Sequence, residues 1–206
     1  MTNNNNLVTE NKTEVNAIEK LIFSKNEMVN MQNELVNNID KALLLALFEG
    51  IKGEDFSELI NMKAEDLKEF GGKFYATLQG SKGSRIITIS QELYNLLLLA
   101  DKQSEYINTN GNISELPYSS FIFKNKYNSK PLDGFYVTRK IILFREMFGI
   151  RYLKARDFAS SGLVYMASQL LEGKNVFEEE DFNKIAQQYN MESSVVKSVL
   201  KSHLTQ

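Results

Sequence analysis

Basic side chains are the residues of this chain whose chemistry can be inferred most directly, because they gather in one segment. Residues 120–156 hold nine Lys and Arg against two Asp and Glu, a local charge of +7, although the whole chain has a net charge of −2. A localised positive surface matters more for phosphate binding than the total charge. The segment therefore predicts a surface for nucleic acid, with a solvated charged face as the alternative.

The composition excludes several other kinds of site. There is no cysteine, so disulfides, zinc-thiolate sites and cysteine nucleophiles are ruled out. The only histidine, His203, lies close to the end of the chain, so a central histidine base or a multi-histidine metal site is not expected. We expect no metal and no cofactor.

Targeting signals are also missing from the sequence. No apolar run reaches the roughly 20 residues that a membrane span needs. The N-terminus is rich in Asn and does not follow the basic-then-apolar order of a signal peptide. We therefore expect a cytoplasmic protein without a membrane partner.

Hydrophobic periodicity indicates which elements position the basic residues. Residues 1–12 are polar and expected to be disordered, and residues 13–37 form one or two amphipathic helices. Residues 38–206 form the main domain, with Asp40 as the cap of its first helix. Helices are predicted at residues 41–49, 55–62, 91–100, 134–148, 158–172, 179–189 and 193–203.

The β structure is expected to be small. Residues 73–78 and 85–89 are two β-prone runs around a Gly/Ser-rich turn, which predicts a hairpin. Residues 101–119 are polar and predicted to be a loop, Phe121–Phe123 a short strand, and Lys124–Pro131 an exposed basic loop. The fold class is therefore mainly α (α+β), a helical bundle with a small β-hairpin or sheet.

Three segments in this order resemble the catalytic domain of the tyrosine recombinases, the family of the phage integrases. Leu44–Gly50 followed by Ser57–Lys63 is similar to the family's opening helix pair, and the hairpin is similar to its β2–β3 element. Gly149–Ala167 is similar to the region that carries a His-x-x-Arg pair. The resemblance covers roughly residues 38–190 and implies a tyrosine-recombinase-like fold.

The resemblance also implies a demanding chemistry. In this family a tyrosine hydroxyl attacks the scissile phosphate. Two arginines and a histidine or tryptophan stabilise the negative charge of the transition state, and a lysine protonates the departing oxygen. Such stabilisation requires donors fixed where the charge develops.

The sequence departs from this pattern at nearly every catalytic position. Lys52 stands for the first arginine and lacks its bidentate fork. Arg156 replaces the histidine and Ala159 the second arginine, while Lys82 matches the hairpin lysine. Tyr189 is a weak candidate for the nucleophile. The resemblance therefore predicts vestigial positions without a catalytic set.

Binding to DNA does not need the catalytic arginines, because attraction to phosphates dominates affinity. Residues on the hairpin, the basic loop, the following helix and the former active site are the candidates. The predicted DNA-binding residues are Lys52, Lys82, Arg85, Lys124, Lys126, Lys130, Thr138, Arg139, Arg145, Arg151, Lys154 and Arg156.

The leading functional hypothesis is a non-catalytic, sequence-specific regulator that binds double-stranded DNA, similar to the integrase-like repressors of SPβ-type prophages. One alternative is an active, divergent recombinase with Tyr189 as nucleophile, Lys52 and Arg156 as phosphate binders and Lys82 as general acid. Another is a protein that caps an integrase or a different phage-encoded factor without contacting DNA.

The resemblance also bears on domain organisation and assembly. About 40 residues precede the catalytic-like domain, too few for the family's usual core-binding domain, so residues 13–37 are either a remnant of it or a helical linker. The C-terminal helix resembles the one that docks on a neighbouring protomer, which predicts a homo-oligomer. Folding back onto its own domain is the alternative.

Overall fold

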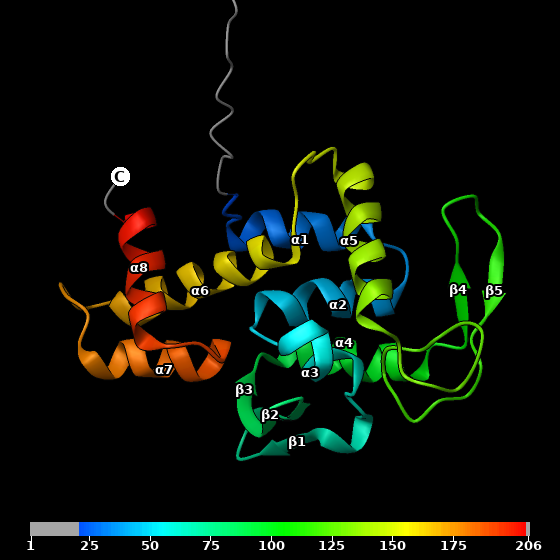
Figure 1. The fold of residues 1–206 in the computed structure, drawn as a ribbon, viewed down its shortest axis with the longest axis horizontal. Coiled ribbons are helices and arrows are strands. Elements are labelled where there is room, and N and C mark those ends of the chain that lie inside the picture. The colour runs from blue at the N-terminus through cyan, green and yellow to red at the C-terminus, as the bar shows by residue number, and fades with distance from the viewer. Residues whose placement is uncertain (1–20, 205–206) are drawn as a thin grey trace, which may run out of the picture.

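The computed structural model describes residues 21–204, so the prediction for residues 1–12 and the first part of segment 13–37 lie outside the described residues. The elements in chain order are α1 (Lys25–Glu34), α2 (Asn38–Phe48), η1 (Glu54–Phe56), α3 (Ser57–Ile60), η2 (Ala64–Asp66), β1 (Leu67–Phe70), β2 (Lys73–Gly80), β3 (Gly83–Ile89), α4 (Gln91–Lys102), β4 (Glu105–Ile107), β5 (Ile113–Glu115), α5 (Gly134–Phe148), α6 (Ala155–Leu171), α7 (Glu179–Tyr189) and α8 (Ser193–Leu204) (Figure 1). The predicted fold class, mainly helical with a small antiparallel sheet, is confirmed.

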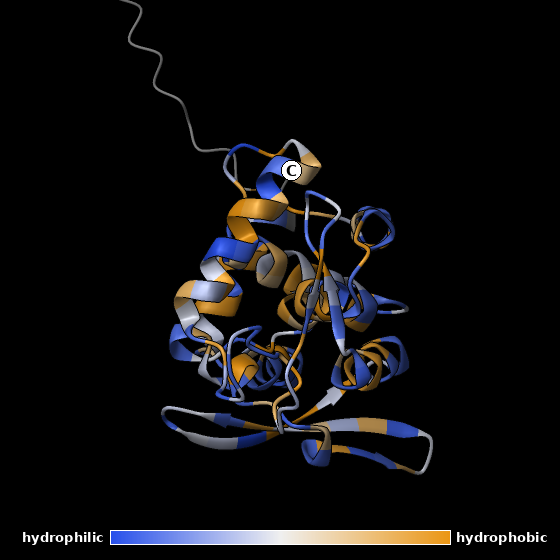
Figure 2. Ribbon diagram, turned by 90° about the vertical axis from the view of Figure 1, so that its right-hand side faces the viewer, coloured by the Kyte–Doolittle hydropathy of each residue, from blue (hydrophilic) through white to orange (hydrophobic). Residues whose placement is uncertain are grey.

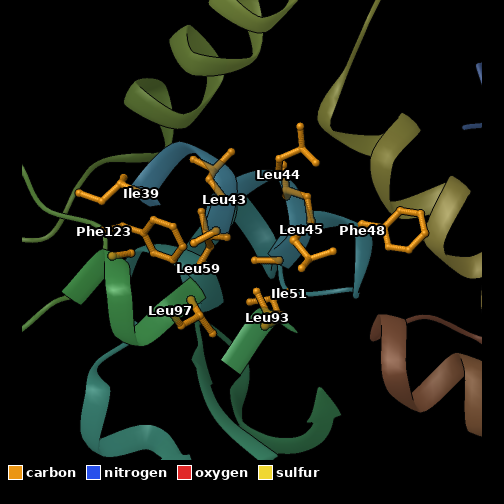
Figure 3. Close-up of a cluster of buried hydrophobic side chains, with 14 of the residues drawn as sticks. Ile39, Leu43, Leu44, Leu45, Phe48, Ile51, Leu59, Leu93, Leu97 and Phe123 are labelled. Atoms are coloured by element: carbon orange, nitrogen blue, oxygen red, sulfur yellow. The ribbon is translucent and has the colours of Figure 1, made fainter. Parts of the chain in front are cut away.

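Helix α2 is the buried centre of the molecule. Nine of its eleven residues are buried, as expected for a helix that is apolar on all sides and enclosed by others. Its leucines interdigitate with side chains of α3 and α4, and Phe48 points toward α6 (Figure 3). The helix begins earlier than predicted, with Asn37 in the N-cap position, so the prediction that Asp40 caps it is wrong.

Helix α1 accounts for part of the predicted helical segment 13–37. A capping box of Ser24 and Glu27 starts the helix. Its buried residues Met28 and Met31 belong to the same hydrophobic cluster as α2. Helix α1 is therefore packed into the main core.

A three-stranded antiparallel sheet, ordered β1-β2-β3, covers one end of the core. The register aligns Leu67, Ala76 and Ile87, which are all buried. The sheet forms one edge of the molecule below the helices (Figure 2). The predicted hairpin is confirmed as β2–β3, whereas β1 was not expected, because four residues are too few to show a period of two.

Two predictions between α4 and α5 are wrong. Residues 101–119 were expected to be a loop, but they contain the hairpin β4–β5. Phe121–Phe123 forms no strand: Phe121 makes a single bridge to Lys63, while Ile122 and Phe123 are fully buried. Burial of these apolar side chains explains the strand-like sequence pattern.

The predicted helix 55–62 is replaced by the short 3-10 turn η1 and the single turn α3. Gly53, Asp55 and Phe56 all have positive φ angles of 69°, 49° and 63°. A continuous helix cannot pass through left-handed residues. The chain therefore forms a compact loop here, which contributes one wall of the site described below.

Helices α6, α7 and α8 enclose a second hydrophobic cluster beside the main core. Val196 and Leu200 of α8 are buried against this chain's own α6 and α7. Helix α8 therefore folds back on its own domain, which was the alternative, and the predicted homo-oligomer stays a prediction.

Within residues 21–204, none of the helices combines the length and the apolar character that crossing a membrane would require. The same residues contain no group of three or more potential ligands that could hold a metal ion.

Candidate functional site

A cavity of about 410 Å³, which we call the hairpin cavity, opens where four parts of the chain converge. Its walls are the loop around η1, the β2–β3 turn, helix α6 and the corner between α7 and α8. The four vestigial positions inferred from the sequence, Lys52, Lys82, Arg156 and Ala159, line it, and so does Tyr189, the weak candidate for the nucleophile. The fold therefore brings together positions that lie up to about 140 residues apart in sequence.

The β2–β3 turn is fastened to the η1–α3 loop. The backbone N–H of Ser81 donates to Ser57 Oγ at 3.2 Å, and Ser81 Oγ donates to Glu54. Lys82, at the tip of the turn, lies 3.5 Å from Glu54 and keeps 81% of its side chain exposed. A surface pair of this kind contributes little stability, so Lys82 is available to an incoming anion.

Arg85 connects the walls of the cavity instead of facing solvent. Its guanidinium forms a bidentate pair with the buried carboxylate of Glu58, at 2.6 and 2.7 Å. The remaining donors reach the backbone carbonyls of Gly50, Gln187 and Gln188. All of its donor groups are engaged within the protein, so the structure does not support the prediction that Arg85 contacts DNA.

Tyr189 lines the cavity, but its hydroxyl is directed into the protein. The hydroxyl donates to the carbonyl oxygen of Phe48 at 2.8 Å, and burial raises the pKa of this phenol well above its usual value. The α8 residue that faces the cavity is Val199, which carries no nucleophilic atom, and none of the lining residues is a histidine.

Replacing Tyr189 with Phe tests whether the Tyr189 hydroxyl has this structural role. The change removes one hydrogen bond and leaves the buried Phe48 carbonyl without its partner, so we expect a loss of about 1–3 kcal/mol in the free energy of unfolding. Urea denaturation measures this quantity. An unchanged free energy of unfolding in Tyr189→Phe would contradict the structural role of the hydroxyl.

The cavity keeps an excess of positive charge after its internal pairs are counted. Lys52, Lys82, Arg85 and Arg156 line it, and Glu54 and Glu58 are its only acidic lining residues, a net charge of +2. The side chain of Arg156 is 65% exposed, and its Nε lies at the long distance of 3.9 Å from Asp157 Oδ1. The ammonium of Lys52 lies over the Phe56 ring. The cavity can therefore attract an anion such as a phosphate.

The remaining predicted contacts divide into exposed and internal groups. Thr138, Arg139, Arg151 and Lys130 are exposed, and Lys126 and Lys154 are partly buried. Arg145 is partly buried and donates from Nε to the Leu153 carbonyl at 2.5 Å. Except for Lys126 and Arg139, which line a second cavity, these residues line none of the three cavities described by the structure.

The expectation that Lys124 lies in an exposed loop is wrong. It is only 8% exposed, and its ammonium donates to the carbonyls of Asp101 and Gln103, at the end of α4. Lys124 therefore fastens the loop to α4. Sequence reasoning also missed the buried pair of Lys140 and Asp40, whose atoms Nζ and Oδ1 are 2.9 Å apart. A lone aspartate within the apolar run of α2 was the available signal.

These features define the class of protein: helices around a small antiparallel sheet, with separate segments meeting at one cavity, form the catalytic-domain fold of tyrosine recombinases. The crystal structure of XerA recombinase is similar over 90% of this chain and 64% of its own, with a TM-score of 0.59 and 15% identity. XerH bound to its difH substrate in a pre-cleavage complex is similar over 86% of this chain and 49% of its own, with a TM-score of 0.58 and 11% identity. A lambda integrase dimer bound to a core site is similar over 87% of this chain and 58% of its own, with a TM-score of 0.54 and 13% identity.

The sequence comparison is more specific. Residues 22–206 match the family described as MrpR, C-terminal catalytic domain, and the chain belongs to that family. A relative from Bacillus subtilis (strain 168), the SPbeta prophage-derived uncharacterized protein YopR, is 28% identical over 185 residues. The match covers 84% of this chain, which spans 57% of the length of that relative.

Proposed function

We propose that this protein is a non-catalytic, sequence-specific DNA-binding regulator of the phage-repressor type, built on a tyrosine recombinase fold. The observation that carries the proposal is the hairpin cavity. It gathers the positions that the resemblance assigns to a recombinase active site and has a net positive charge, yet its one tyrosine hydroxyl is hydrogen-bonded to a backbone carbonyl inside the protein.

Three features of the hairpin cavity support the non-catalytic part of the proposal. Ala159 supplies no donor, and Lys52 cannot give the planar fork of an arginine. Loss of one fixed donor at a developing negative charge typically lowers a rate by about 10²–10³-fold. A Tyr189 phenol that is buried and raised in pKa is also a poor nucleophile at neutral pH.

Phosphate binding makes smaller demands, and the cavity meets them. Positive side chains suffice to hold a phosphate in position without acting on it. The difH substrate bound by XerH and the COC' core site bound by lambda integrase support the same class of ligand. The prophage origin of the Bacillus subtilis relative supports a phage-related role.

Mobility shifts at graded salt concentration test DNA binding. We expect the wild-type chain to bind duplex DNA, with an affinity that falls steeply as salt rises. Lys52→Glu combined with Arg156→Glu should weaken binding at least about tenfold, because both changes reverse charge in the hairpin cavity. The matched control is Lys184→Glu, an exposed change on α7 outside this cavity. Equal affinities for wild type and the cavity variant would contradict the proposal.

A preferred duplex is first selected from a random library with the wild-type protein, and its binding site is located by footprinting. This duplex is then used to test for catalysis. A nicked suicide substrate would trap a recombinase as a covalent complex with DNA. We expect no trapped complex with the wild-type chain. A trapped complex that disappears in Tyr189→Phe would show an active recombinase instead, and absence of DNA binding at low salt would favour the protein-capping alternative.

A further inference from the structure

A second cavity, of about 200 Å³, shares no lining residue with the hairpin cavity. We call it the α5 cavity, because helix α5 forms one of its walls; the others are β4 with the turn that follows it and the loop that carries Lys126. Its lining residues are Tyr106, Asn108, Thr109, Lys126, Tyr136, Arg139, Lys140 and Leu143. None of these eight is acidic, and three are basic.

The floor of the α5 cavity is the buried side chain of Lys140, whose charge is balanced by Asp40. Lys140 is 6% exposed, and its ammonium lies 2.9 Å from Asp40 and 4.0 Å from the centre of the Tyr106 ring. Burial lowers the pKa of Lys140, Asp40 opposes this, and the nearby charge of Lys126 lowers it further. Lys140 is therefore fixed in place by its pairing, and Lys126 lies close enough to influence its pKa.

The rim carries two cations that the floor does not neutralise. Neither Lys126 nor Arg139 forms a salt bridge to any residue in the described part of the chain. Each lies over an aromatic ring instead: Lys126 over Tyr127 at 5.2 Å and Arg139 over Phe135 at 4.4 Å. Stacking holds a cation in position but does not cancel its charge. With Lys140 and Asp40 compensating each other, the α5 cavity keeps a charge of about +2.

Neutral donors complete the lining. Burial raises the pKa of the Tyr136 hydroxyl to about 12, so it stays protonated at neutral pH and can donate a hydrogen bond. The side chain of Thr109 offers a second hydroxyl at the same cavity. A planar guanidinium, an ammonium and a phenol around one space match the oxygens of a phosphate.

The size of the space limits the ligand. Pockets for complete small molecules typically occupy about 300–1,000 Å³, and the α5 cavity is smaller. It suits one charged group of a larger ligand. It also gathers three of the nine cations in segment 120–156 that gave the first indication of phosphate binding.

We propose that the α5 cavity binds one backbone phosphate of DNA, as an anchor separate from the hairpin cavity. This inference rests on the proposed function, since it assigns a second contact to the same DNA. Arg139 and Lys126 hold the phosphate oxygens, and the Tyr136 hydroxyl donates to one of them. Lys140 contributes positive charge from below while it remains paired with Asp40.

The test combines protein variants with DNA in which single phosphates are replaced by neutral methylphosphonates. Wild-type protein, the double variant Lys126→Gln with Arg139→Gln, and the single variant Tyr136→Phe are compared on the same selected duplex. The control is Lys184→Gln, which removes an exposed cation on α7 that lies outside the cavity and outside the predicted DNA-binding residues. Urea denaturation of each variant confirms that it is folded.

We expect the double variant to bind at least about tenfold more weakly than wild type, with a salt dependence reduced by about one phosphate contact. Tyr136→Phe should weaken binding about three- to tenfold and leave the salt dependence unchanged, because it removes no charge. One methylphosphonate position should weaken the wild type but not the double variant.

The outcomes separate this inference from the proposed function. If the wild type binds no DNA, both proposals fail together. If it binds DNA but every methylphosphonate weakens wild type and double variant equally, the α5 cavity is not a phosphate anchor and only this inference fails. Binding of an acidic peptide that is lost in the double variant, with DNA affinity unchanged, would overturn it in favour of a protein partner.

Discussion

Gly162→Ala is expected to destabilise the protein by about 4 kcal/mol or more, among the largest effects of a single substitution. A Cβ atom at Gly162 would lie 1.6 Å from the carbonyl oxygen of Phe48 and 2.6 Å from the hydroxyl of Tyr189. The first contact is with backbone, so α2 and α6 would have to separate. Their separation would also break the Tyr189–Phe48 hydrogen bond.

The sign of this prediction is opposite to that expected from helix propensity alone. Within α6, replacing glycine with alanine would ordinarily stabilise the helix by about 1 kcal/mol. Ser168→Ala in the same helix is the control, since Ser168 is exposed and the change should shift stability by less than about 0.5 kcal/mol. Urea denaturation measures both. A Gly162→Ala protein as stable as wild type would show that the two helices are not in backbone contact.

Asp40→Ala is the second change with a large expected effect, a loss of about 3–5 kcal/mol. It leaves the ammonium of Lys140 buried without its carboxylate, since the two side chains are only 7% and 5% exposed. It also removes the acceptor of the Tyr106 hydroxyl, 2.5 Å away. The substitution would therefore remove the contacts by which Asp40 of α2 holds Lys140 of α5 and Tyr106 of the β4–β5 hairpin.

Two further variants show whether the loss of stability comes from breaking a buried ion pair. Replacing both partners, Asp40→Leu with Lys140→Met, should recover most of the stability, because a buried pair is often no more stabilising than apolar side chains of similar size. Glu180→Ala breaks the exposed pair with Lys184 and should cost less than about 0.5 kcal/mol. If Asp40→Ala were as mild as Glu180→Ala, the pair would not be buried in solution.

The sequence predicted the long helices and the main hairpin because their signals are local. Apolar residues at helical spacing fix α2, α4, α5, α7 and α8 to within a few residues, and Ser90 caps α4 as expected. The strands β1, β4 and β5 have only four, three and three residues. Such segments are too short to show a repeat, and partners elsewhere in the chain decide whether they form.

In the candidate site, too, some features could be predicted from the sequence and others could not. Its vestigial positions could be predicted, since motif order places them on elements that meet. What each cation contacts could not, because those contacts are distant in sequence. Lys124 and Lys126 look equivalent in the sequence, yet the first donates to carbonyls more than twenty residues away and the second lines a cavity. Tyr189 lines the hairpin cavity, but its hydroxyl faces Phe48 because Gly162 leaves room beside it.

The contacts of Arg85 have a consequence for any mutational screen that scores loss of DNA binding. A substitution there would release the β2–β3 turn from Gly50 and from the end of α7, and would leave the buried Glu58 carboxylate without its cation. Such a variant would score as defective while having lost no contact with a ligand. Its defect would be recognised by faster proteolysis in the absence of DNA, whereas a variant in a true ligand contact would resist protease like the parent protein.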